Sequence, residues 1–120
     1  MPKLYEYVLE IAKDKKYNKM VIRESEIIAE NKTQYVYDYQ GVFYILDKKE
    51  KLYAKFVNNS FFYKVPFYRV CYYTTKLGKQ SENVVIKALK KLADETCFIN
   101  DVVNNIDIKF TLIKSSGGSN

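Results

Sequence analysis

The sequence contains no histidine and no tryptophan, and only two cysteines, two prolines and four glycines among its 120 residues. Without histidine it lacks the commonest general base and the commonest transition-metal ligand. Cys71 and Cys97 cannot form a four-ligand zinc site by themselves. Gly41 and Gly78 are isolated in the sequence, so no glycine-rich phosphate loop is present. These absences predict a protein that is not an enzyme and that uses no metal and no cofactor.

Long apolar runs are also absent. No stretch approaches the roughly 18 consecutive apolar residues of a membrane-spanning helix, and the opening segment 1–6 lacks the apolar centre of a signal peptide. We therefore expect a cytoplasmic protein with no membrane partner. Both cysteines lie within apolar patterns, which predicts that both are buried thiols.

Arginine is scarce although the chain is basic, with a formal net charge of +6. Arg23 and Arg69 are the only arginines, and the remaining cations are lysines. Lysine, tyrosine, isoleucine, asparagine and phenylalanine are abundant, and all five have AT-rich codons, which indicates a low-GC genome. A basic surface permits an acidic partner, but arginine is the side chain that nucleic-acid and phosphate sites prefer for bidentate contacts.

Alternating apolar residues predict a series of antiparallel strands. Segments 4–11, 19–30 and 33–39 each have this pattern, and imperfect alternation around Glu24–Glu26 indicates a bulge or a short helix over 24–30. The segments 42–46 and 51–57 are predicted to form a hairpin across a charged loop. A turn is expected at 58–60, Pro66 marks an edge or a break, and a further strand follows over 67–75.

The pattern changes after Gly78. Ser81 is predicted to cap a helix over about 82–103, because apolar residues then recur at steps of three and four, as on one face of a helix: Val85, Leu89, Leu92, Thr96, Ile99 and Val103. Clear alternation over about 106–113 predicts a C-terminal strand. The fold class is therefore α+β: an antiparallel sheet or small, partly open barrel of six or seven strands, with one amphipathic helix. Residues 1–114 form one domain, and 115–120 have the composition of a flexible tail.

Aromatic and cationic residues on the strands and the helix are the candidate binding residues. Tyrosine rings can bury area at an interface or stack on bases, and lysines can follow phosphates. The alternative is that the tyrosines belong to the core. The candidates are Tyr35, Tyr37, Tyr39, Tyr53, Arg69, Lys87, Lys90 and Lys91. Glu24 and Glu26 could share one face of a strand, but such a pair is typical of a solvated edge, and no catalytic residue is assigned.

Three stretches carry a resemblance to a class of known proteins. The opening Lys3-Leu4-Tyr5-Glu6-Tyr7-Val8, the segment 27–36 and Tyr72-Tyr73-Thr74-Thr75 before a lysine-rich helix resemble small proteins of phages and mobile elements in low-GC bacteria. The resemblance covers most of the chain and implies an accessory protein that acts by stoichiometric binding in the host cytoplasm, as inhibitors of host defence such as anti-CRISPR proteins do. The expected partner is a host protein or nucleoprotein. Binding of single-stranded nucleic acid, or sequestration of a nucleotide, is the alternative function.

Overall fold

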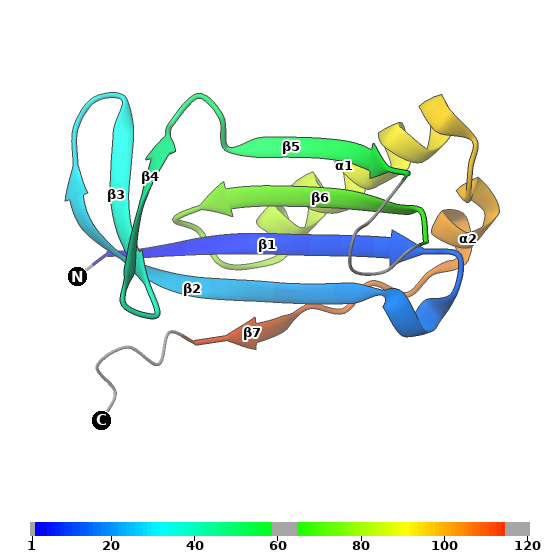
Figure 1. The fold of residues 1–120 in the computed structure, drawn as a ribbon, viewed down its shortest axis with the longest axis horizontal. Helices are drawn as coiled ribbons and strands as arrows, with labels where there is room; N and C mark the ends of the chain where they lie inside the picture. The colour runs from blue at the N-terminus through cyan, green and yellow to red at the C-terminus, as the bar shows by residue number, and fades with distance from the viewer. Residues whose placement is uncertain (1, 59–64, 115–120) are drawn as a thin grey trace.

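The computed structural model describes residues 2–58 and 65–114, and it has an antiparallel sheet with helices on one face (Figure 1). The strands follow the order β4-β3-β2-β1-β6-β5 across the sheet, with β1 near its middle. Their bounds are β1 Lys3–Ala12, β2 Lys19–Glu30, β3 Gln34–Tyr39, β4 Val42–Asp47, β5 Leu52–Val57, β6 Phe67–Thr74 and β7 Thr111–Ile113. A short 3-10 helix, Lys15–Tyr17, joins β1 to β2. The predicted α+β class is confirmed.

Helix α1, Lys79–Thr96, packs behind β6 and β1 (Figure 1). It begins after Gly78, so the prediction that Ser81 is the N-cap was wrong, and the Ser81 hydroxyl instead donates to the carbonyl of Lys76 at 2.6 Å. The helix ends at Thr96 because Cys97 takes a left-handed conformation with φ 56°. A second helix, α2, Asn100–Asn105, continues the apolar stripe that we predicted as one helix to Val103.

The main core lies between α1, α2 and the sheet. Tyr7, Leu9 and Tyr68 of the sheet are fully buried against Val85 and Leu89 of α1. Ile99 and Val103 are also buried, whereas Leu92 is only partly buried and Thr96 is exposed. The predicted stripe is therefore a packing face over most of its length.

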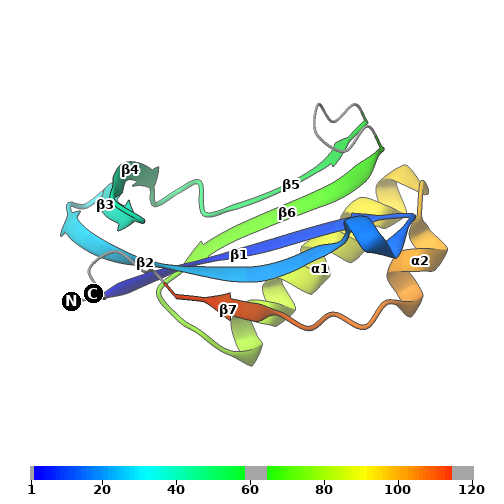
Figure 2. The ribbon, with the colours of Figure 1, turned by 60° about the horizontal axis from the view of Figure 1, so that its bottom comes forward.

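The two ends of the sheet curl away from the helices, as Figure 2 shows for β3, β4 and β5. A second, smaller cluster forms where β3 and β4 cross the ends of β1 and β2. Its buried members are Leu4, Ile27, Tyr37 and Leu46, with Tyr35, Tyr39 and Tyr73 packed around them. The curl makes the helix-free face of the sheet concave.

The predicted hairpin of 42–46 with 51–57 was wrong. β4 pairs with β3, through a two-residue turn in which Gln40 and Gly41 both have positive φ, and β5 pairs with β6. β4 and β5 are therefore neighbours in sequence but lie at opposite edges of the sheet. Alternation placed β4 and β5 to within one residue, but it carries no information about which strand pairs with which.

Other predictions at this level have mixed outcomes. A bulge in β2 between Ile27 and Ala29 is confirmed in place of the short helix, and Pro66 lies just before β6. Only 111–113 of the predicted strand 106–113 pairs, and it pairs in parallel with β2. Cys71 is buried as predicted, but Cys97 is exposed because it ends α1. The predicted tail 115–120, and positions 59 and 60 of the predicted turn, lie outside the described residues.

Candidate binding surface

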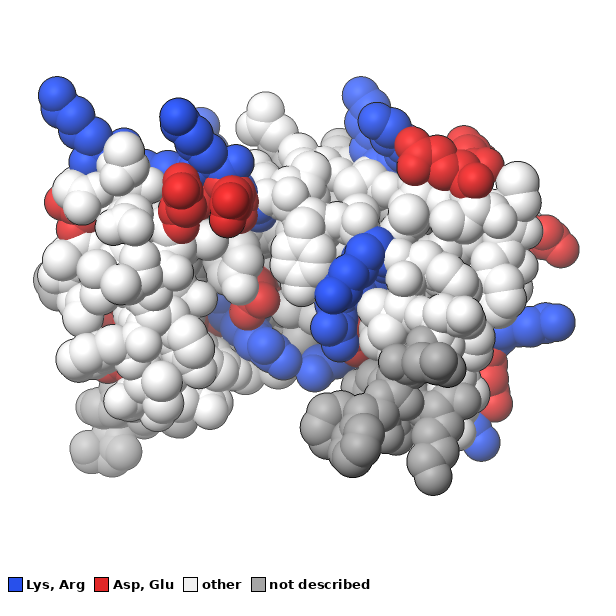
Figure 3. Space-filling model, turned by 45° about the horizontal axis from the view of Figure 1, so that its top comes forward, with Lys and Arg blue, Asp and Glu red and all other residues white. Residues whose placement is uncertain are grey.

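Strand register places polar side chains in rows across the concave face. Glu6 of β1 lies between Arg23 of β2 and Tyr73 of β6, and Glu10 lies between Lys19 and Arg69. Between these two charged rows lies a third row, formed by Val8 of β1, Cys71 of β6 and Tyr53 of β5. Lys55 of β5 pairs with Arg69 and so extends the row of Glu10. Both arginines of the sequence therefore lie on this one face. The space-filling view shows a hollow between the β3–β4 end and the rest of the molecule, with Lys, Arg, Asp and Glu side chains gathered in it (Figure 3). We call this surface the concave face and define it by Glu6, Glu10, Arg23, Tyr37, Tyr53, Lys55, Arg69, Cys71 and Tyr73.

The first row is held together by Glu6. Its carboxylate accepts a hydrogen bond from the Tyr73 hydroxyl at 2.9 Å, and its other oxygen lies 3.5 Å from the Arg23 guanidinium. The ring of Tyr37 lies 6.2 Å from that of Tyr73, and the two hydroxyls also interact. Burial and the nearby negative charge of Glu6 raise the pKa of Tyr73 far above its ordinary value of 10.0, and burial raises that of Tyr37. Both tyrosines therefore remain neutral at physiological pH.

The second charged row contains a buried carboxylate. The side chain of Glu10 is only 5% exposed, and it accepts a hydrogen bond from the Arg69 Nε at 2.8 Å. Its other oxygen, Oε1, is buried and has no hydrogen-bond partner. Arg69 is one-third exposed and also lies over the ring of Phe67 at 5.2 Å. The pair fixes Arg69 at the surface, since a buried carboxylate needs its cation.

Tyr53 is the most accessible aromatic residue of the concave face. It is 43% exposed at the edge strand β5, and the Lys55 ammonium lies 6.0 Å from its ring centre. Its hydroxyl interacts with the Cys71 thiol, and burial is the main cause that raises the pKa of Tyr53 to about 12. Burial raises the pKa of Cys71 as well. An activated nucleophile needs a lowered pKa or an adjacent base, and these two groups have the opposite environment.

The structure brings together three of the eight predicted site residues, Tyr37, Tyr53 and Arg69, on the concave face. Tyr37 is 9% exposed and belongs to the small β3–β4 cluster, with Tyr35 and Tyr39 partly buried beside it. The ring of Tyr35 lies under the Lys48 ammonium at 4.7 Å, and that of Tyr39 lies 5.9 Å from the Arg23 guanidinium. The three predicted tyrosines of β3 are therefore packed against neighbouring residues and are not strongly exposed to solvent.

The lysines of α1 lie elsewhere. Lys87, Lys90 and Lys91 are exposed on the helix, which packs on the opposite face of the sheet from the concave face. Of these, Lys91 borders a cavity of about 290 Å³ between α1 and β5, together with Leu52, Tyr53 and Leu92. Lys91 therefore meets one predicted tyrosine, Tyr53, at this cavity, whereas Lys87 and Lys90 do not line it.

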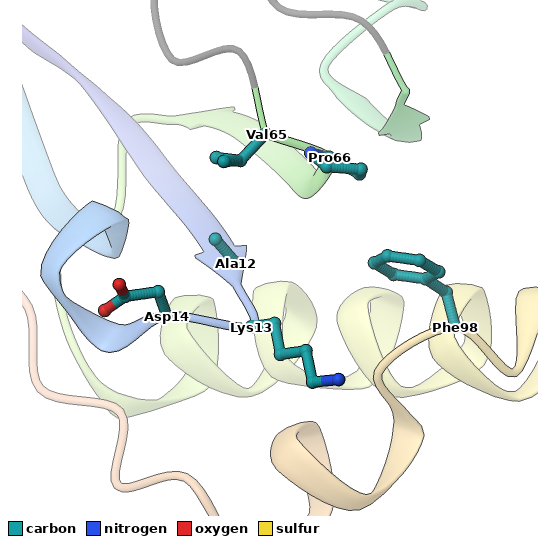
Figure 4. Close-up of a pocket in the computed structure, with 6 residues that line it drawn as sticks. All are labelled: Ala12, Lys13, Asp14, Val65, Pro66 and Phe98. Atoms are coloured by element: carbon teal, nitrogen blue, oxygen red, sulfur yellow. The ribbon is translucent and has the colours of Figure 1, made fainter.

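A second cavity, of about 350 Å³, lies beside the end of β1, and Figure 4 shows the residues that line it. Its lining includes Ala12, Lys13 and Asp14 at the end of β1, Val65 and Pro66 before β6, and the Phe98 ring from the α1–α2 link. Phe98 is 46% exposed and lies 4.9 Å from the ring of Phe56. None of the predicted site residues lines this cavity.

Sequence reasoning missed Glu6, Glu10, Arg23, Cys71 and Tyr73 as members of the site. A usable pattern existed, because Glu6 and Glu10 interrupt a strand whose other residues are mostly apolar, and the only two arginines also fall in strands. Charged residues within buried strands generally have partners. The register that matches each glutamate with its arginine could not be obtained from a single sequence.

Within residues 2–58 and 65–114, no group of three or more Cys, Asp or Glu side chains is placed to hold a metal ion. No helix among the described residues is long and apolar enough to cross a membrane. Comparison with known proteins finds no matching family model, no similar curated protein and no similar solved structure.

Proposed function

We propose that this protein acts without catalysis, by stoichiometric binding to a host protein or nucleoprotein, and that the concave face makes the contact. The anti-defence role, of the kind that anti-CRISPR proteins have, follows from the resemblance to small phage and mobile-element proteins. The observation that carries the binding proposal is that both arginines and the exposed Tyr53 lie on one hollowed, helix-free face. Arginine and tyrosine are the residues enriched at protein interface hot spots.

The chemistry of this face favours binding over catalysis. Both oxygens of Glu6 are engaged, by Tyr73 and Arg23, and the one unpartnered oxygen of Glu10 is buried, so neither carboxylate is presented to a substrate. The raised pKa values of Tyr53, Tyr73 and Cys71 keep these groups protonated near neutral pH. They serve as hydrogen-bond donors, as contact residues do.

The same observations favour a protein partner over single-stranded nucleic acid. Arg23 and Arg69 already face carboxylates, which leaves Lys19 and Lys55 as the additional cations of these rows. A base-stacking platform needs several accessible rings, whereas Tyr37 and Tyr73 are turned into the structure and Tyr53 alone is strongly exposed. The excess of positive charge instead suits an acidic segment of a protein partner.

The test uses tagged protein in a lysate of a low-GC bacterium, with and without nuclease. Wild type is compared with Tyr53→Ala and Lys55→Glu, whose side chains are exposed. The control replaces Lys87 and Lys90 by alanine and leaves Lys91, which lines a cavity with Tyr53. We expect a captured protein that survives nuclease, is lost with the concave-face variants and is retained by the control. The purified partner should then be inhibited at one-to-one stoichiometry.

The nucleic-acid alternative predicts the reverse pattern. Capture would disappear on nuclease digestion, fall steeply with salt, and depend on Lys87 and Lys90 of α1 more than on Tyr53. That result would replace the proposed function by the alternative. Tyr37→Ala separates packing from contact, since we expect it to lower the melting temperature rather than only weaken binding.

A further inference from the structure

Strand β4 presents four consecutive large apolar side chains to solvent. Val42 is 52% exposed, Phe43 and Ile45 are each 68% exposed, and Tyr44 is 43% exposed. Neighbouring residues of a strand point to opposite faces, so Phe43 and Ile45 form an apolar patch on one face, and Val42 and Tyr44 lie on the other, where the Tyr44 ring stacks on that of Tyr37 at 5.3 Å. Phe43 and Ile45 are the most exposed of the large hydrophobic residues in the described part of the chain.

β4 is also an edge strand whose outer side pairs with no other strand among the described residues. Exposed edges are normally protected by lysine, proline, a bulge or a short strand. The other edge strand, β5, contains Lys55 and follows Lys51, but Val42–Leu46 contains no charge and no proline, and its pairing with β3 has no register shift. The lack of protection on β4 indicates that something covers it.

We infer that β4 pairs antiparallel with β4 of a second copy of this chain. Tyr39 and Val42 flank the two-residue turn and form a hydrogen-bonded pair. Hydrogen-bonded and non-hydrogen-bonded pairs alternate along an antiparallel ladder, so the backbone N–H and C=O groups of Phe43 and Ile45 point away from β3, to the open edge. A two-fold axis at Tyr44 lets Phe43 of each copy bond to Ile45 of the other. This register places an aromatic ring opposite a β-branched side chain twice, which is a favourable cross-strand pair.

Charge permits this register. It places Val42 opposite Leu46, and Asp47 opposite Gly41, so no two like charges face each other along the strand. Because both copies use the same edge, the contact closes on itself and does not propagate into a fibre. The patch is smaller than the roughly 800 Å² per partner of a standard interface, so the dimer should dissociate on the order of micromolar concentration.

The experiment is sedimentation equilibrium over a range of protein concentrations. Wild type should change from monomer to dimer, and Ile45→Lys and Phe43→Lys should each raise the dissociation constant at least tenfold. Both side chains are exposed, so an unchanged melting temperature would confirm that these variants fold. The matched control is Leu77→Lys, which replaces a side chain that is 48% exposed in the link between β6 and α1 and should leave the dimer intact.

Cross-linking tests the register independently. In a Cys97→Ser background, Tyr44→Cys places two thiols at a close, non-hydrogen-bonded pair, where the Cα separation of about 4.5 Å suits a disulfide. Mild oxidation should link two chains, and adding Ile45→Lys should prevent it. A protein that stays monomeric at every concentration, or a dimer indifferent to Phe43→Lys and Ile45→Lys, overturns the inference, and a dimer without the cross-link overturns the stated register. Phe43→Lys and Ile45→Lys replace no residue of the concave face, so binding by that face is tested separately with these two variants.

Discussion

Replacement of Arg69 by methionine is the sharpest test of how the concave face is held together. Glu10 is 5% exposed and Arg69 is its one ion-pair partner among the described residues, so Arg69→Met leaves a buried carboxylate without its cation. Removing one partner of a buried ion pair costs about 3–5 kcal/mol. Because Arg69 is one-third exposed and its site can admit water, we expect the lower end, about 3 kcal/mol of unfolding free energy.

A double-mutant cycle isolates the cause of that loss. Glu10→Gln keeps an oxygen that can accept from Arg69 but removes the charge, and it should cost about 1 kcal/mol. In the Glu10→Gln background, Arg69→Met should then also cost only about 1 kcal/mol, so the coupling between the two sites is about 2 kcal/mol.

The assay is urea unfolding followed by circular dichroism, with the slope against urea checked for constancy across the four proteins. The corresponding drop in melting temperature for Arg69→Met is about 10 °C. If Arg69→Met costs the same whether position 10 is glutamate or glutamine, the buried charge is not what Arg69 compensates. The account of the concave face given above would then be incorrect.

Four further outcomes are expected. Tyr68→Phe should cost about 2 kcal/mol in urea unfolding, since the buried Tyr68 hydroxyl accepts from the backbone N–H groups of Phe98 and Ile99, each at 3.2 Å; the same change at Tyr72, a partly buried tyrosine of the same strand, should cost less than half as much. Leu89→Ala should cost about 2–5 kcal/mol by the same assay, because Leu89 is fully buried between α1 and the sheet; a near-neutral result would contradict that packing. Iodoacetamide should label exposed Cys97 in the folded protein and spare Cys71, whose raised pKa keeps its thiol protonated, and mass spectrometry of the peptides would show the opposite if the two environments were misassigned. The melting temperature should be constant below about pH 9 and fall as the pH rises through 9.0 and 10.0, the ordinary pKa values of cysteine and tyrosine, because Cys71, Tyr53 and Tyr73 hold their protons more tightly in the folded than in the unfolded protein. Tyr53→Phe should make this fall smaller. Melting curves that do not change up to pH 11 would show that these three groups do not couple protonation to folding.

The strands were predictable because their residues alternate, and the pairing of the strands was not. β1 and β3 fall almost where alternation places them, although β1 is buried on both faces over residues 7–12. The pairing of β5 with β6 rather than with β4 depends on how the sheet curls, which is a property of the whole chain. A charged stretch between two apolar runs fits a hairpin loop and a link across the sheet equally well.

The helix shows a different limit. The apolar positions from Val85 to Val103 keep their spacing through the break at Cys97, because α2 returns to the same core. The left-handed conformation of Cys97 ends α1 without changing the spacing of the apolar residues. Glycine or asparagine usually takes this conformation, so a cysteine at position 97 did not indicate the end of a helix. The pattern therefore predicted which side chains are buried better than it predicted where the helix ends.

At the candidate site, the residue types were predictable from the sequence, but the direction in which their side chains point was not. Tyr35, Tyr37 and Tyr39 share one face of β3, as their spacing requires, but that face packs on the β3–β4 cluster because the sheet curls over it. Arg69 was identified, whereas its partner Glu10 was not, since the two are brought together by the pairing of β1 with β6. The exposure of Val42–Ile45 was equally hidden, because an apolar run normally predicts burial.

The central position of β1 has a consequence for how binding competence arises during folding. β1 pairs with β2 through a short local connection, and β3 pairs with β4 through a two-residue turn, so these contacts close small loops. The pairing of β1 with β6 joins Tyr5 to Thr74 and must wait for a much larger loop to close, which is entropically costly and slow. Glu6–Tyr73 and Glu10–Arg69 both span that late pairing. Refolding protein should therefore regain much of its strand content before its concave face exists, and partner binding should recover with the slower phase.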